Sequence, residues 1–130
     1  MAILNSIKTL FPGMGNATEY IALTAQNVPI NAATTFAFTG FTNFVRSAKV
    51  RLHVTAAPAG SQITGIKITG TDGTTTTTFL EDKTSRTAAE TLDLFWEILS
   101  DLQLTTVNVI VTLANTGTAM TADLELAGNP

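Results

Sequence analysis

The chain has 130 residues, the size of one ordinary domain, and its single hydrophobic core needs no disulfide or metal support. It contains no cysteine, which excludes disulfides and thiolate metal sites, and a net charge of −3 argues against binding to nucleic-acid phosphates. Charged residues make up 13% of the chain against 45% hydrophobic residues, and threonine is abundant, which is typical of a β-rich protein with a hydroxyl-bearing surface. No apolar run approaches the roughly 20 residues of a membrane span, and the N-terminus lacks the pattern of a secretory signal.

Residues 1–17 differ from the rest of the chain and are expected to form an N-terminal arm. Five apolar side chains recur at the spacing of one face of a short helix, and Pro12 and Gly13 end it. A short apolar helix is not stable alone, so it must cover an open end of its own domain or dock on a neighbouring subunit. The apolar residues of the arm are Ile3, Leu4, Ile7, Leu10 and Phe11.

Residues 18–130 are predicted to form one β-sandwich domain, and its first half contains four strands. In the third of these, apolar Val50, Leu52 and Val54 alternate with polar residues, so His53 is expected on a solvated outer face rather than in a ligand set. Phe41 is expected to help close one end of the sandwich, together with Phe44. The four predicted strands span residues 18–25, 33–39, 48–56 and 62–70.

A hairpin turn at Asp72 and Gly73 leads into a threonine-rich fifth strand that ends at Leu80. This turn lacks the alternating acidic positions of a helix-loop-helix calcium site, so its role is geometric.

The segment Thr87–Leu104 fits two interpretations. Thr87 as a cap, Glu90 three residues later and an apolar face would make it a helix. Its similarity to an earlier strand favours instead a strand around 91–94, followed by a short helical turn at 96–102. We expect the second arrangement, with further strands at 104–114 and 120–127.

A repeat supports this arrangement. Residues 50–55 match 107–112 at an offset of 57 residues, while 32–38 match 88–94 at an offset of 56 and 66–70 match 124–128 at an offset of 58. Three matches in the same order predict a duplicated four-strand unit, and therefore an all-β, eight-stranded jelly-roll-like β-sandwich built from two similar halves.

No residue pattern predicts an enzyme. The single histidine lies on an outer face, so it cannot activate a serine or help to hold zinc. Four carboxylates between Glu90 and Asp101 could in principle hydrolyse glycosides, but their spacing equally describes a solvated edge. No glycine pattern that cradles phosphate opens a helix, so no cofactor is expected.

Trp96 is the only tryptophan and has three possible roles. It can fill the core between the sheets, stack against a sugar, or anchor a subunit contact, because aromatic residues are enriched at interfaces.

Three features resemble small β-sandwich virion proteins of tailed bacteriophages: the Thr-rich stretch 66–75 with its Asp72-Gly73 turn, a later aromatic residue, and the strand 104–109 that follows it. In size and style the chain is similar to head decoration, or cement, proteins with jelly-roll folds. The resemblance implies a homodimer or homotrimer that is made in the host cytoplasm, binds the major capsid protein and stabilises the capsid surface of the virion. Contacts are then expected from the five apolar residues of the arm and from Trp96. The alternative is a carbohydrate-binding β-sandwich module of a phage fibre or receptor-binding component.

Overall fold

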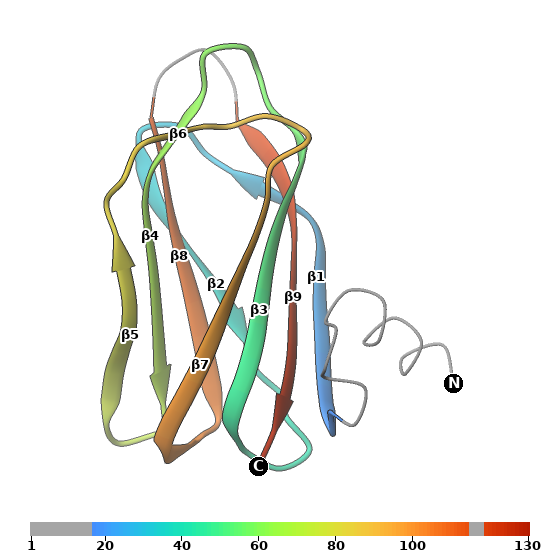
Figure 1. The fold of residues 1–130 in the computed structure, drawn as a ribbon, viewed down its shortest axis with the longest axis vertical. Helices are drawn as coiled ribbons and strands as arrows, with labels where there is room; N and C mark the ends of the chain where they lie inside the picture. The colour runs from blue at the N-terminus through green and yellow to red at the C-terminus, as the bar shows by residue number, and fades with distance from the viewer. Residues whose placement is uncertain (1–16, 115–118) are drawn as a thin grey trace.

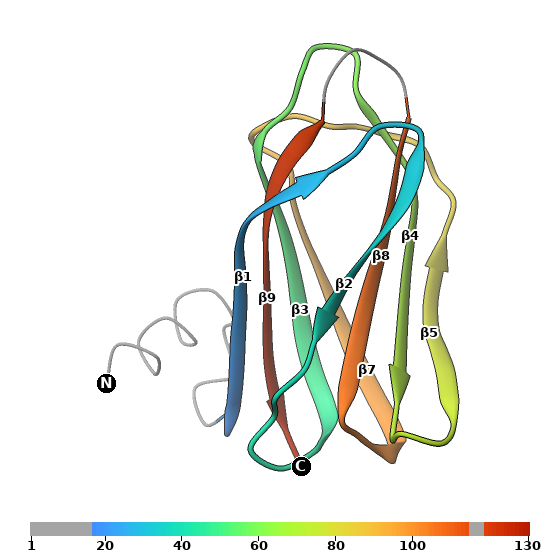
Figure 2. The same cartoon turned by 180° about the vertical axis from the view of Figure 1, so that it is seen from behind.

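The computed structural model describes residues 17–114 and 119–130, which form two antiparallel sheets packed face to face (Figure 1). Sheet 1 has the strand order β1-β9-β3-β7, and sheet 2 has the order β2-β8-β4-β5, with the short β6 also paired to β4. Figures 1 and 2 show the two layers from opposite sides, with β7 nearer in the first view and β2 nearer in the second. The strands are β1 (Glu19–Val28), β2 (Ala32–Phe38), β3 (Val45–Ala56), β4 (Gln62–Thr71), β5 (Thr76–Asp82), β6 (Arg86–Thr87), β7 (Asp93–Leu104), β8 (Thr106–Ala114) and β9 (Met120–Asn129).

The strand order confirms the predicted jelly-roll-like sandwich of two similar halves. Each half gives two long strands to each sheet, β1 and β3 to sheet 1 and β2 and β4 to sheet 2 in the first half. Exchanging β1, β2, β3 and β4 with β5, β7, β8 and β9 turns the order of sheet 1 into that of sheet 2. The ninth strand, β6, has two residues and was not predicted.

The repeated strands line the core from opposite sheets. Val50, Leu52 and Val54 of β3 are fully buried, as are Val107, Val109 and Val111 of β8. Burial of one such aliphatic side chain contributes roughly 1.5–3 kcal/mol, so these two strands supply a large part of the stability. The period-2 alternation predicted for both strands is therefore confirmed.

The repeat also extends to a pair of tightly packed glycines. A Cβ added at Gly70 of β4 would lie 2.8 Å from Cε2 of Phe79, and one added at Gly128 of β9 would lie 2.8 Å from Cγ1 of Val45. Real Cβ contacts are essentially never this short, so the close packing at both positions requires glycine, which has no side chain.

The segment Thr87–Leu104 contains one long strand, and the predicted helical turn at 96–102 is wrong. β7 runs from Asp93 to Leu104, and its first seven residues pair with Ser47–His53 of β3. Pairing with β3 determines the conformation of these residues, and it overrides their moderate helix propensity. The predicted match of 88–94 to β2 is displaced as well, because only its last two residues lie in β7.

The turn chemistry agrees with the sequence analysis. Gly73 has a φ of +99°, and Oδ1 of Asp72 accepts hydrogen bonds from the backbone N–H groups of Thr74 and Thr75. These donors lower the pKa of Asp72, with Thr75 contributing most. Phe41 packs against the core between β2 and β3, as expected for a residue that closes the sandwich end.

Candidate functional site

The outer face of sheet 1 carries the densest group of interacting polar side chains in the part of the chain described by the structure. Because directly opposed residues of antiparallel strands point to the same face, Arg51 of β3 lies between Glu125 of β9 and Phe95 of β7. The neighbouring row contains His53 between Asp123 and Asp93. The face therefore combines residues that are far apart in the sequence.

Arg51 is the centre of this face. Its Nε and Nη2 donate to the two carboxylate oxygens of Asp93 at 2.8 and 2.9 Å, and its Nη1 donates to Oε1 of Glu125 at 2.7 Å. The hydrogen bond to Asp93 is the largest cause that raises the pKa of Arg51 above its usual range. The guanidinium thus joins β3 to both of its neighbouring strands through a geometry that favours arginine over lysine.

Tyr20 extends the network to β1. Its hydroxyl donates to Oε2 of Glu125, whose side chain is 9% exposed. Burial and then this hydrogen bond raise the pKa of Tyr20, so the phenol stays protonated and acts as a donor. Glu125 therefore accepts from a phenol and a guanidinium, which compensates the cost of burying its charge.

His53 lies at the margin of the network. Its Nδ1 is 3.8 Å from Oδ2 of Asp93, and this nitrogen is buried without a hydrogen-bond partner. The predicted outer-face position is confirmed, with the side chain 30% exposed. Among the described residues, no group of three His, Asp or Glu residues could hold a metal ion.

Two large apolar side chains stand beside the network. Phe95 is 51% exposed and Leu99 is 74% exposed, and within 17–114 and 119–130 no other large hydrophobic residue is exposed. Both project from the outer face of β7, and the guanidinium of Arg51 lies 5.9 Å from the Phe95 ring centroid. Sequence reasoning missed this pair, although the alternation of residues 93–99 would have placed both on one face once the helical turn was discarded.

Trp96 lies on the opposite face of β7. It is opposite Val50 of β3, is partly buried and packs against the core. This placement agrees with the core role among the three that the sequence allows. The other predicted contact residues, Ile3, Leu4, Ile7, Leu10 and Phe11, lie outside the described residues.

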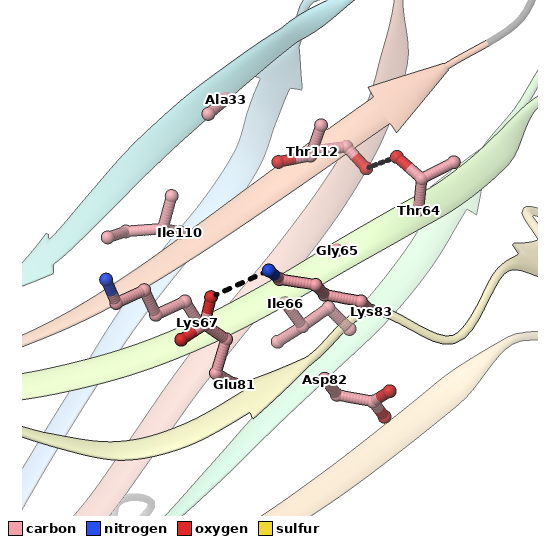
Figure 3. A pocket seen from close by; sticks show the side chains of 10 residues that line it. All are labelled: Ala33, Thr64, Gly65, Ile66, Lys67, Glu81, Asp82, Lys83, Ile110 and Thr112. Atoms are coloured by element: carbon pink, nitrogen blue, oxygen red, sulfur yellow. Dashed lines mark hydrogen bonds and ion pairs between the residues drawn. The ribbon is translucent and has the colours of Figure 1, made fainter.

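The outer face of sheet 2 has a shallow hollow of about 340 Å³ (Figure 3). Ala33 and Ile110 form part of its apolar floor, and at its rim Nζ of Lys83 lies 3.6 Å from Oε1 of Glu81. Among the described residues that line the hollow, none is a nucleophile with an adjacent base. The described residues that line it are Ala33, Thr64, Gly65, Ile66, Lys67, Glu81, Asp82, Lys83, Ile110 and Thr112.

No protein-family model matches the chain, and no curated protein matches it. Among solved structures, the chain is similar to one of the Clostridium thermocellum N-terminal endo-1,4-β-D-xylanase 10B, which contains CBM22-1 and GH10 modules in complex with xylohexaose. The two share 8% sequence identity with a TM-score of 0.48, over 85% of this chain and 26% of that chain. The chain thus matches about a quarter of that protein's length. The part of the chain that the structure describes contains no helix that could cross a membrane.

Proposed function

We propose that this protein is a non-enzymatic structural component of a virus particle, of the capsid decoration or cement type. It binds across subunits of the capsid shell and associates with copies of itself. The observation that carries the proposal is the exposed pair Phe95 and Leu99 on an edge strand of a rigid sandwich. Exposed apolar side chains in this setting commonly mark protein contacts.

The surface chemistry supports the same assignment. The polar side chains of sheet 1 are engaged with one another, as the contacts of Arg51 with Asp93 and Glu125 show. Such a network holds a surface in one shape, which suits a protein that binds by matching contact area. The apolar residues of the arm, from Ile3 to Phe11, would supply a second contact to a neighbouring subunit or to the shell.

The experiment that tests this function measures occupancy on purified particles. Deletion of Met1–Gly15 should leave a folded sandwich, seen by circular dichroism, that no longer binds the shell. A second variant keeps the length of the arm but replaces Ile3, Leu4, Ile7, Leu10 and Phe11 with serine. It should lose occupancy as well if the apolar side chains make the contact, and normal occupancy of both variants would refute the role of the arm.

A carbohydrate-binding module is the second candidate, and one observation favours it. The ring of Phe95 lies on the same sheet face as the ordered donors and acceptors of Arg51, Glu125 and Tyr20. Aromatic faces combined with fixed polar groups are typical of ligand sites. Calorimetric titration with oligosaccharides tests it: binding that Phe95→Ala abolishes and Trp96→Phe preserves would favour this candidate.

A further inference from the structure

No strand of the described residues pairs with the outer edge of β7. β7 is the last strand of sheet 1, and its ladder within the described residues is with β3. Residues Asp93–Leu99 pair with Ser47–His53 without a register shift, so the opposite edge presents a regular row of backbone donors and acceptors. This stretch contains no lysine and no proline, the residues that commonly protect an edge from pairing.

The other three edges of the sandwich differ from this one. The ladder of β1 is interrupted between Leu23 and Gln26, where Ala25 has a φ of +53°, and the ladder of β5 shifts opposite Ile68 and Thr69. β2 is regular, but it exposes only small side chains such as Ala33 and Ala37. β7 alone among these edges combines a regular ladder with two exposed, large apolar side chains.

We propose that this edge pairs with the same edge of a second copy of the chain. The two β7 strands run antiparallel across a twofold axis that passes beside Trp96, and sheet 1 continues from one subunit into the next. A twofold contact of this kind is isologous, so the same stretch serves both partners. The inference names the self-association surface of the proposed function and rests on it.

The charges of β7 select the register. With Trp96 opposite Trp96 of the partner subunit, Asp93 faces the partner's Leu99 and Phe95 faces the partner's Glu97. In this register all seven residues of each strand pair. Core-facing side chains lie opposite core-facing side chains of the partner subunit, and no acidic residue lies opposite another. A shift by one pair in either direction opposes Glu97 to the partner's Glu97, or Asp93 to the partner's Glu97, and like charges in direct opposition are destabilising.

The first test compares two charges at one position. Leu99→Glu places a carboxylate opposite the partner's Asp93, and the twofold axis repeats this contact. The dissociation constant of the dimer should therefore rise roughly tenfold. Leu99→Lys places an ammonium opposite the same Asp93 and should keep the dimer. The matched controls are Thr78→Glu and Thr78→Lys on the exposed surface of β5, which make the same changes in net charge and should leave the mass by analytical ultracentrifugation unchanged.

The second test reports the register through engineered cysteines, since the chain has none of its own. Phe95→Cys and Glu97→Cys are prepared as separate proteins, mixed and oxidised. Directly opposed positions fit a disulfide, so the mixed dimer should form, whereas each variant alone places its own cysteines too far apart to bridge efficiently. Equal cross-linking of one variant alone would refute this register.

The outcomes separate the inference from the proposed function. A wild-type protein that is monomeric or trimeric in solution, or a dimer unaffected by Leu99→Glu, overturns the edge pairing. A monomer whose β7 amides become protected from hydrogen exchange only on the particle also overturns it, and assigns the edge to a strand of another protein. A dimer with the expected responses that never binds a shell supports the edge pairing and counts against the decoration role alone.

Discussion

Arg51 ties together the outer face of sheet 1. Its guanidinium bonds to Asp93 on one side and to Glu125 on the other, and Glu125 in turn accepts from Tyr20. The connected residues come from all four strands of the sheet. One planar cation therefore aligns β1, β9, β3 and β7 on the solvent side, while the aliphatic side chains do so on the inner side.

Replacing Arg51 should destabilise the fold. In Arg51→Gln the carboxylate of Glu125 stays buried without its cation, which costs about 3 kcal/mol in the free energy of unfolding. Arg51→Lys should cost less than Arg51→Gln because it keeps the positive charge, although it loses the paired donors of the guanidinium. Urea denaturation measures both, with Arg46→Gln on the exposed part of β3 as a control that should change stability little. Equal midpoints for the Arg51 and Arg46 variants would contradict the network's role.

Asp82 provides a pH prediction. The hydrogen bond from Arg86 is the largest cause that lowers its pKa from 3.8 to about 2. Because the folded value lies below the ordinary one, the stabilisation is present above pH 4 and is lost as the pH falls toward 2. An NMR titration of the carboxyl should show a midpoint near 2 in the wild type. Arg86→Gln should move it upward, and Lys83→Gln, whose ammonium is near Glu81 instead, should not.

For single residues, the sequence predicted the face of the sheet on which a side chain lies but not its hydrogen-bond partners. The alternation of β3 placed Arg51 and His53 outward correctly. The partners of Arg51 are 42 and 74 residues away, and finding them requires the registers of two separate strand pairs. A one-residue slip in either register would move the carboxylate to the other face of the sheet, so composition and spacing alone could not identify the network.

Among the elements, β7 was predicted only in part from the sequence. The repeat correctly favoured a strand over a long helix between Thr87 and Leu104. The helical turn was expected because the repeat matched residues 95–101 to the aromatic connection 41–46 of the first half. The twelve-residue strand arises from pairing with β3, which is a tertiary effect. The exposed pair Phe95 and Leu99 was missed for the same reason.

β9 should tolerate a side chain poorly at Gly128. Gly128→Ala brings the new Cβ to 2.8 Å from Val45 Cγ1 and 3.1 Å from the backbone oxygen of Ser47, so we expect a loss of about 1–3 kcal/mol. Gly65→Ala in β4 is the matched control, since its nearest contact is an ordinary 3.5 Å to Thr112. Thermal unfolding compares the two, and similar melting temperatures would contradict the close approach of β3 and β9.

On the scale of the whole molecule, the two halves are interleaved rather than side by side. Sheet 1 alternates strands of the two halves, because β9 lies between β1 and β3, and sheet 2 places β8 between β2 and β4. No half can therefore pair its own strands into either sheet. The duplicated four-strand unit was predictable because the repeat appears directly in the sequence. The interleaved strand order, the strand ends and the irregularities of the ladders depend on contacts between distant segments.

Cutting the chain in the Asp72–Gly73 turn tests the interleaving. The fragments 1–72 and 73–130 should each be largely unfolded alone, because the neighbours of their strands are on the other fragment. Mixed at equal concentrations, they should regain the circular dichroism of the intact protein. A fragment that folds alone as a monomer would contradict the arrangement.

The pairing of the first and last strands also determines how the sandwich responds to force. Glu19 at the start of β1 lies opposite Gly128 near the end of β9, and the two strands run antiparallel. Tension applied to the two chain ends therefore peels β1 from β9 like a zipper, loading one rung of the ladder at a time, since the hydrogen bonds are perpendicular to the strands. A load that pulls β1 and β9 in opposite directions along their length would instead strain many rungs together in shear. The sandwich should therefore open at lower force under a load on its two chain ends than under a load that strains the ladder in shear.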